Sequence, residues 1–151
     1  MMNGNNKPLT ILLVDDDPDC RMLIRDAISE CRVNNAVLEA ANGQEALDIL
    51  SKATELPGLI YMDIEMPQMN GIETVQRIKS DPRFHHIPVV MMTGVSEEAQ
   101  MRNAAEAGAN SYTLKPANAE QFLKTVLAST NYWLAIHQYP EHRLPQSACR
   151  R

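Results

Sequence analysis

The sequence predicts an α/β fold with a doubly wound, five-stranded parallel sheet and helices on both faces. Five short apolar runs rich in β-branched residues alternate along the chain with five segments that have the apolar spacing of amphipathic helices. Most of these apolar runs lack an alternation of apolar and polar residues, which is typical of strands buried on both faces. A strand-helix alternation with short connections favours parallel strands joined by right-handed crossovers.

The strands are predicted where the apolar runs lie between turn residues. They span residues 9–14, 36–40, 59–63, 89–93 and 111–114. Four of the five show no period-two alternation, so we expect them to be buried on both faces. Only residues 36–40 read as a half-exposed strand.

The helices are predicted from apolar residues at intervals of three and four. The clearest stripe runs from Cys20 to Cys31, with Pro18 in the first turn and Asp17 as the expected N-cap. The other predicted helices span residues 45–52, 72–79, 97–107 and 118–136. Gly108 follows the fourth of these helices and is expected to end it.

The bulk composition indicates one globular domain. The chain has 151 residues, 44% of them hydrophobic, and a formal net charge of −5, which gives no attraction to nucleic acid or to anionic membranes. Three cysteines without CxxC spacing argue against a disulfide framework or a zinc site. We expect a disordered N-terminus over residues 1–8, a domain over 9–136 with an extended last helix, and a tail over 137–151.

Neither a membrane span nor a targeting segment is predicted. The longest apolar runs fall far short of the roughly 20 residues that a spanning helix needs. The first eight residues, MMNGNNKP, lack the apolar stretch of a signal peptide. We therefore expect a cytoplasmic protein.

Polar residues whose side chains can bind ions or react follow the predicted strands. The stretch LTILLVDDDPD takes the first strand into Asp15 and Asp16, Asp63 ends the third strand, Thr93 ends the fourth, and Lys115 follows the fifth. The carboxyl ends of parallel strands meet at one edge of the sheet, so these side chains are expected to share a crevice.

Three clustered carboxylates call for a cation. At an effective dielectric constant near 20, two carboxylates about 4 Å apart repel each other by about 4 kcal/mol. The strand ends offer hard oxygen ligands and no histidine or thiolate, which favours Mg²⁺ over Zn²⁺. Mg²⁺ and the Lys115 ammonium would together neutralise the three carboxylates.

A neutralised site of this kind is suited to a dianionic phosphoryl group. Mg²⁺, Lys115 and the Thr93 hydroxyl would contact the phosphoryl oxygens, while an aspartate oxygen attacks phosphorus in line. The nucleophile is expected to be one of the aspartates.

Four segments, in order, resemble a known family. ILLVDDDP, IYMDIEMPQMNGIE, IPVVMMTG and SYTLKP lie between about residues 8 and 127. Together they resemble the receiver domains of response regulators in two-component signalling, which have a flavodoxin-like fold. The resemblance implies a protein that catalyses only its own phosphorylation and dephosphorylation.

The resemblance also implies roles for individual residues. Asp63 matches the phosphoacceptor, Asp15 and Asp16 match metal-binding carboxylates, the backbone carbonyl of Glu65 matches a further metal ligand, Thr93 and Lys115 match the residues that contact the phosphoryl group, and Tyr112 matches an aromatic switch residue. The same resemblance implies a cis peptide bond before Pro116. Asp17 is expected to cap the first helix and not to bind metal.

The last helix suggests partners. It continues as TNYWLAIHQYP, and we expect Trp133 and Leu134 to extend an apolar stripe beyond the domain and form a partner surface. The alternative is that Trp133 folds back onto its own domain. The ending resembles single-domain regulators that accompany phytochrome kinases, which implies a sensor histidine kinase as partner, a phytochrome among the candidates, and a homodimer through the fourth helix, fifth strand and fifth helix.

Two other functions fit parts of the pattern. An Mg²⁺-dependent phosphatase with an aspartate nucleophile would place a general acid two residues later, where Glu65 lies. The Asp15–Asp16 pair, the Lys115–Pro116 pair and the lack of a substrate cap argue against it. An adaptor that works without phosphorylation is the second alternative.

Overall fold

A computed structural model describes residues 8–31, 34–94 and 96–137 of the chain. Its elements are β1 (Thr10–Val14), α1 (Pro18–Ser29), β2 (Ala36–Ala40), α2 (Gly43–Lys52), β3 (Leu59–Asp63), α3 (Gly71–Ser80), β4 (Val89–Thr93), α4 (Glu98–Ala107), β5 (Ser111–Leu114) and α5 (Ala119–His137). The predicted terminal segments, 1–8 and 137–151, lie almost entirely outside the described residues, so their boundaries stay a prediction.

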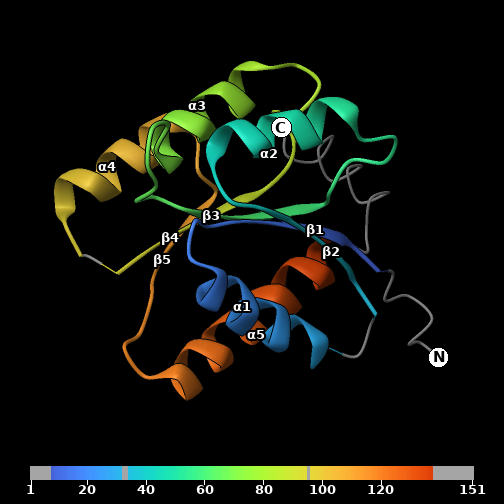
Figure 1. The fold of residues 1–151 in the computed structure, drawn as a ribbon, viewed down its shortest axis with the longest axis vertical. Helices are drawn as coiled ribbons and strands as arrows, with labels where there is room; N and C mark the ends of the chain where they lie inside the picture. The colour runs from blue at the N-terminus through green and yellow to red at the C-terminus, as the bar shows by residue number, and fades with distance from the viewer. Residues whose placement is uncertain (1–7, 32–33, 95, 138–151) are drawn as a thin grey trace, which may run out of the picture.

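The five strands form one parallel sheet in the order β2-β1-β3-β4-β5. Helices α1 and α5 cover one face of the sheet, and α2, α3 and α4 cover the other (Figure 1). The predicted doubly wound fold with helices on both faces is therefore confirmed. The order reverses between β1 and β3, which places the expected ligand crevice at the carboxyl ends of these two strands.

Each face of the sheet buries its own apolar cluster. Leu12 and Met62 belong to the cluster under α2, α3 and α4, whereas Leu13 and Tyr61 belong to the cluster under α1 and α5. Successive residues of a central strand thus enter different apolar layers. This explains why β1, β3 and β4 show no period-two pattern in the sequence.

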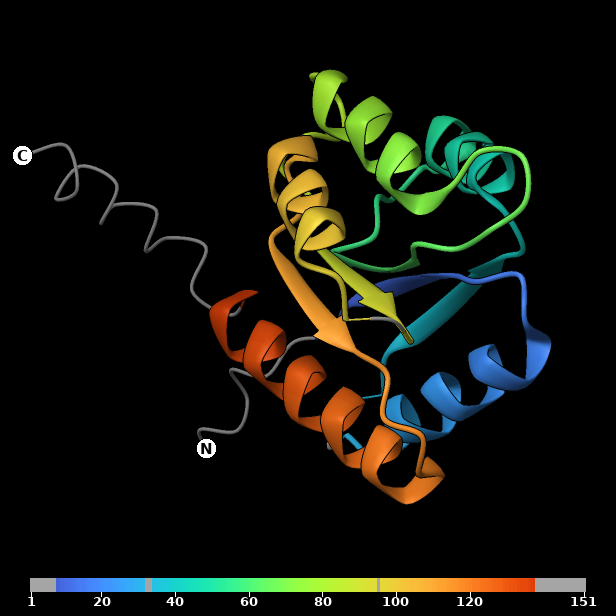
Figure 2. The same ribbon diagram turned by 90° about the vertical axis from the view of Figure 1, so that its left-hand side faces the viewer.

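The two edge strands differ from the three central ones. β2 was predicted to be half exposed, and three of its five residues are exposed in the structure. The prediction that residues 111–114 are buried on both faces is wrong, because β5 is only partly buried and Leu114 is 46% exposed. Its place at the sheet edge, between α4 and α5 (Figure 2), leaves one side of the strand uncovered.

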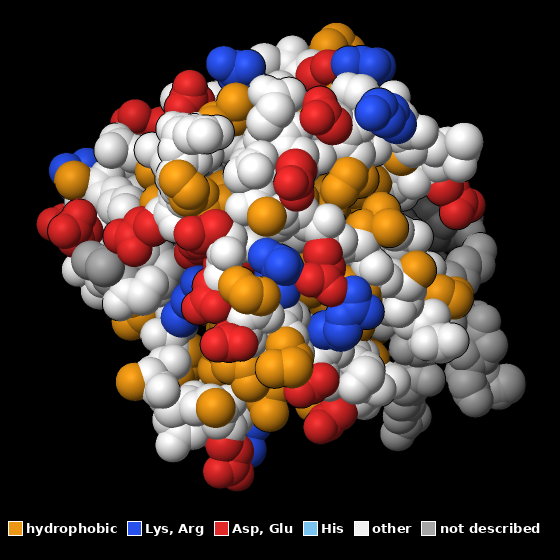
Figure 3. Space-filling model, in the orientation of Figure 1, with side chains coloured by type: hydrophobic (Ala, Val, Ile, Leu, Met, Phe, Trp, Pro, Cys, Tyr) orange, Lys and Arg blue, Asp and Glu red, His pale blue; other side chains and the backbone are white. Residues whose placement is uncertain are grey.

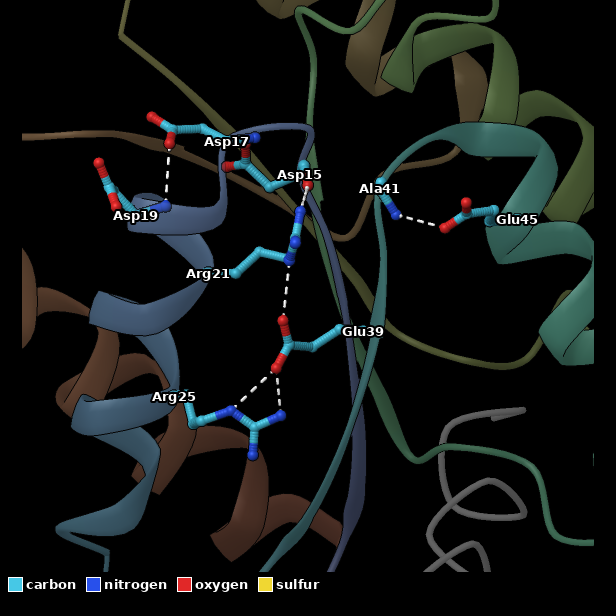
Figure 4. Close-up of polar contacts among 8 residues, drawn as sticks. All are labelled: Asp15, Asp17, Asp19, Arg21, Arg25, Glu39, Ala41 and Glu45. Atoms are coloured by element: carbon cyan, nitrogen blue, oxygen red, sulfur yellow. Dashed lines mark hydrogen bonds and ion pairs between the residues drawn. The ribbon is translucent and has the colours of Figure 1, made fainter.

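Two helices begin earlier than the apolar spacing indicated. The side chain of Asn42 accepts a hydrogen bond from the backbone N–H of Glu45, and Asn70 does the same for Glu73. Glu45 in turn accepts from the N–H of Ala41, which completes a reciprocal cap at the start of α2 (Figure 4). In α1 the predicted N-cap is confirmed, since Asp17 accepts from the N–H of Asp19.

Helix α5 packs on α1 and the sheet through residues spaced four apart. Phe122, Val126, Thr130 and Leu134 are all at most 4% exposed. The expectation of an exposed Trp133-Leu134 pair beyond the domain is wrong: Leu134 is buried in the cluster beneath α1 and α5, and Trp133 packs partly against it. The four-residue spacing turns Leu134 toward the sheet. Because Trp133 packs against the same cluster, the alternative that this tryptophan folds back onto its own domain is confirmed.

Within the described residues, no helix is both long enough and apolar enough to cross a lipid bilayer.

Candidate functional site at the strand ends

The end of β1 holds Asp15 in a fixed environment. Its side chain is 2% exposed, and its backbone N–H donates to the carbonyl of Ala40 at 3.1 Å. Its Oδ1 accepts a hydrogen bond from the N–H of Asp17 at 2.9 Å, so the chain turns away from the sheet directly after the strand. This turn leaves Asp16 exposed at the mouth of the crevice.

The end of β3 places Asp63 against the start of α3. Asp63 is 6% exposed. The N–H of Gly71 donates to the carbonyl of Ile64 at 2.9 Å, which draws the helix start close to the strand. A Cβ atom at position 71 would lie 2.1 Å from the backbone oxygen of Asp63, so the approach requires glycine.

Thr93 and Lys115 come from the ends of β4 and β5. Thr93 is fully buried, and its carbonyl accepts the backbone N–H of Lys115 at 2.7 Å. The Lys115 ammonium lies 3.0 Å from Asp15 Oδ2 and 3.0 Å from Asp63 Oδ1. A single cation therefore bridges the carboxylates of β1 and β3.

The pKa values show how charge is distributed in the crevice. Burial and the negative charge of Asp15 raise the pKa of Asp63 to about 6, although Lys115 opposes this shift. Burial lowers the pKa of Lys115, but the charges of Asp15 and Asp63 outweigh burial and hold it above its usual value. Lys115 therefore stays charged at neutral pH, and it neutralises only part of the acidic cluster.

A buried thiol borders the same cluster. Burial, followed by the neighbouring Asp15, raises the pKa of Cys20 to about 12. The protonated thiol is a poor nucleophile and a poor metal ligand. Cys20 thus acts as a small core residue, as does Cys31, which is also buried and free.

The carboxylates are close enough to share a cation. One oxygen from each of Asp15, Asp16 and Asp63 lies within 4.8 Å of the others. Hard oxygen donors with a surplus of negative charge fit Mg²⁺ or Mn²⁺. The face of the molecule drawn in Figure 3 has several acidic side chains near its middle and toward α4, with fewer basic side chains beside them.

The predicted switch residue lies outside the acidic cluster. The Tyr112 hydroxyl donates to Gln100 Oε1 at 3.1 Å and so links β5 to α4. Burial, then Glu97 and Glu65, raise the pKa of Tyr112. The Glu65 side chain is exposed, and the role of its carbonyl as a metal ligand stays a prediction.

One expectation carried by the resemblance is wrong. The described residues contain no cis peptide bond, so the bond between Lys115 and Pro116 is trans. The trans form is the more stable one for most bonds before proline.

Two residues beside the site, Arg21 and Glu39, were not predicted from the sequence. Arg21 of α1 donates from Nη1 to the backbone carbonyl of Asp15 at 2.6 Å and from Nε to Glu39 Oε1 at 2.8 Å. The available signal was a single charged residue, Glu39, inside the otherwise apolar strand AVLEA.

Comparisons with known proteins agree with this geometry. Residues 11–127 match the family model of the response regulator receiver domain. A chemotaxis protein CheY homolog from Campylobacter jejuni is 34% identical over 108 residues, which are 72% of this chain and 82% of that protein.

Two solved structures have the same fold. The phosphorylated cyanobacterial phytochrome response regulator RcpA has a TM-score of 0.82 and 29% identity, over 85% of this chain and 96% of its own. The Mn²⁺-bound form of response regulator Rcp1 has a TM-score of 0.79 and 26% identity, over 84% and 95%. The family match covers most of the chain, and the strand order and the acidic cluster at the strand ends agree with it. The chain therefore belongs to the receiver domains of response regulators in two-component signalling.

Proposed function

We propose that this receiver domain takes a phosphoryl group from a histidine-kinase partner in the cytoplasm onto Asp63, with Mg²⁺ as cofactor. The observation that carries the proposal is the Lys115 ammonium, which lies 3.0 Å from both Asp15 and Asp63 inside a cluster of three carboxylates. We take residues 9–136 as the functional unit. The likeness to RcpA supports a phytochrome kinase as a candidate donor.

The cation would be held by Asp15, Asp16, Asp63 and the backbone carbonyl of Glu65. Receiver domains bind Mg²⁺ or Mn²⁺ at an acidic site, and the related Rcp1 has a Mn²⁺-bound form. When bound, the dication supplies the positive charge that allows an anionic carboxylate to approach an anionic phosphoryl group.

The transfer itself needs only one nucleophile from this chain. A carboxylate oxygen of Asp63 attacks phosphorus in line with the donor, an O–P bond forms, and the P–N bond to the donor histidine breaks with its electron pair left on nitrogen. Lys115 already lies beside that oxygen and pairs with the phosphoryl oxygens. The Thr93 hydroxyl is proposed to bond another of these oxygens.

The response is proposed to reach the surface through β5. Movement of Thr93 toward the phosphoryl group changes the space beside Tyr112, whose hydroxyl contacts Gln100 of α4 in the unphosphorylated structure. Phosphorylation then shifts the population between two arrangements of α4 and β5.

The surface formed by α4, β5 and α5 is the proposed dimer interface. These three elements lie side by side (Figure 2). Four large apolar side chains on them are strongly exposed: Met101 at 44%, Leu114 at 46%, Tyr132 at 59% and Ile136 at 48%. An exposed apolar group of this kind supports association with a second copy.

Acetyl phosphate treatment followed by intact-mass measurement tests the proposal. The parent should gain one phosphoryl group with Mg²⁺ present, and Asp63→Asn should gain none. Asp17→Asn is the matched control, because Asp17 is an acidic residue of the same loop that caps α1, a role asparagine also fills. Equal phosphorylation of parent and Asp63→Asn would overturn the assignment.

Phosphate monoesters separate the receiver from a phosphatase. A receiver releases about one equivalent of product per chain and then only as fast as it dephosphorylates itself, whereas a phosphatase hydrolyses monoesters continuously at its full rate. Sustained hydrolysis that is lost in Glu65→Gln would favour the phosphatase and contradict the proposal.

A further inference from the structure

Three charged side chains lie beside the acidic crevice without belonging to it. Arg21 and Arg25 project from α1 toward Glu39 of β2 (Figure 4). Glu39 Oε1 accepts from Arg21 Nε at 2.8 Å, and Glu39 Oε2 accepts from Arg25 Nε at 2.9 Å. Glu39 is thus held from two sides, and these hydrogen bonds, the one from Arg25 first, lower its pKa.

Arg21 extends this network into the proposed metal site. Its Nη1 donates to the backbone carbonyl of Asp15 at 2.6 Å, and that carbonyl belongs to the peptide group joining Asp15 to Asp16. The N–H on the other side of Asp15 donates to Ala40 at 3.1 Å. Both backbone groups of Asp15 are therefore fixed, one by β2 and one by Arg21.

The orientation of this peptide decides where Asp16 points. Asp15 is also held through its side chain, since Oδ1 accepts from Asp17 and Oδ2 from Lys115. Asp16 is exposed, and rotation of the peptide before it would swing its carboxylate away from the oxygens of Asp15 and Asp63. The carbonyl bond from Arg21 opposes that rotation.

We propose that Arg21, oriented by Glu39, is a positioning residue for the divalent-cation site, which it serves by fixing the peptide between Asp15 and Asp16. The inference rests on the proposed function, because it concerns the cation that phosphotransfer requires. A guanidinium suits the task, since its Nε and Nη1 donors form a rigid fork that reaches a carboxylate and a carbonyl together. The Arg21 side chain is only 18% exposed, so solvent competes weakly for these bonds.

Electrostatics and positioning predict opposite results for the loss of Arg21. A cation near the site repels a bound dication, so removing its charge alone would tighten metal binding. Loss of the carbonyl bond lets the ligands move and weakens binding. Substitutions around metal ligands typically weaken affinity by about tenfold or more.

Mn²⁺ binding, measured by the electron paramagnetic resonance signal of the free ion, tests the inference on the full chain. Arg21→Met keeps most of the apolar stem and removes the donors, and it should raise the Kd for Mn²⁺ about tenfold. Arg25→Met is the matched control: it removes a cation from the same network but no contact with Asp15, so its Kd should stay within about twofold of the parent. Arg21→Lys keeps the charge and should give an intermediate Kd.

A second readout separates positioning from a general loss of structure. In acetyl phosphate reactions the half-saturating Mg²⁺ concentration should rise with Arg21→Met by the same factor as the Kd. The rate at saturating Mg²⁺ should change by less than about twofold, because Arg21 contacts neither Asp63 nor Lys115. If Arg21→Met does not fold, the comparison of Arg21→Lys with the parent carries the test at constant charge.

Mn²⁺ binding by Arg21→Met or Arg21→Lys as tight as that of the parent would overturn the inference and leave the proposed function intact. A parent that binds no Mn²⁺ would instead overturn the proposed metal site and the inference with it.

Discussion

Asp63, the proposed nucleophile, lies in a buried and acidic environment. Burial and the neighbouring Asp15 raise its pKa to about 6, while Lys115, at 3.0 Å, favours its ionised form. This pKa lies about two pH units above the usual value for aspartate, and each pH unit corresponds to about 1.4 kcal/mol. Without a bound divalent cation, ionisation of Asp63 therefore destabilises the folded state, even with Lys115 beside it.

Replacement of Asp63 by asparagine should stabilise the protein in the absence of metal. Because the pKa is raised on folding, the stability associated with protonated Asp63 is fully present below about pH 4 and is lost as the pH rises through about 6. In EDTA at about pH 8, Asp63→Asn should increase the free energy of unfolding by about 1 to 3 kcal/mol, with no gain near pH 4. Urea denaturation measures this difference, and a variant less stable than the parent at about pH 8 would contradict it.

Gly71 controls the approach of α3 to the nucleophile. A Cβ atom there would lie 2.1 Å from the Asp63 carbonyl oxygen, a distance that forces the backbone to move. Gly71→Ala should cost about 2 kcal/mol or more of stability and slow phosphorylation at Asp63. Gly94→Ala is the control, because a Cβ at position 94 meets nothing within 4 Å. Similar effects of both substitutions would contradict the steric argument.

At the scale of elements, one buried polar contact joins the central strand to the last helix. The Tyr61 hydroxyl lies 2.7 Å from Thr130 Oγ1, and Thr130 donates to the carbonyl of Val126 at 2.8 Å. Since the Thr130 proton is used within α5, Tyr61 is the donor between the two hydroxyls. Thr130 occupies the same helix face as Phe122 and Leu134, so a polar residue takes a core position there.

Removal of the Tyr61 hydroxyl and removal of the Thr130 hydroxyl should lower the free energy of unfolding by different amounts. Tyr61→Phe leaves Thr130 bonded to Val126, so we expect a loss of about 1 kcal/mol. Thr130→Val removes the partner at 2.7 Å from a fully buried Tyr61 hydroxyl, whose contact with the Val126 carbonyl is longer at 3.4 Å, and should cost about 2 kcal/mol. The double variant should lose less than the sum of the two. Equal single losses that add fully would show that the hydroxyls are not coupled.

For the whole molecule, the sheet explains why the site could be predicted. Asp15, Asp63 and Thr93 are each at the end of a strand, and a parallel sheet brings strand ends together whatever the side chains around them. Their proximity therefore follows from the alternation of strands and helices. The burial of β1, β3 and β4 followed from the same pattern.

Contacts between elements could not be predicted in the same way. The bond from Arg21 to Asp15, and the pairing of Tyr61 with Thr130, depend on how α1 and α5 are rotated and placed over the sheet. Helical periodicity gives the buried side of a helix but not its partner residues. The exposure of Leu134 and of β5 was predicted wrongly for the same reason. The local spacing of apolar residues does not show which strand lies at the sheet edge or how a helix packs on the sheet.

The dimer surface can be tested with two exposed apolar residues. Leu114 lies on β5 within the proposed interface, and Met22, at 55% exposure, lies on α1, which is not one of the three proposed interface elements. In the presence of beryllofluoride and Mg²⁺, Leu114→Glu should shift the protein to the monomeric mass in light scattering, because burying a charge opposes association. Met22→Glu should keep the mass of the parent. A Leu114→Glu variant that still dimerises would exclude this surface.

The central claim is that the acidic cluster captures a phosphoryl group on Asp63 only when a divalent cation balances its charge. Borohydride reduction of the acetyl phosphate reaction converts an aspartyl phosphate to homoserine, which peptide sequencing by mass spectrometry locates. We predict homoserine at position 63 with Mg²⁺ and none with EDTA. Homoserine at another aspartate, or equal yield at position 63 without the cation, would contradict the account.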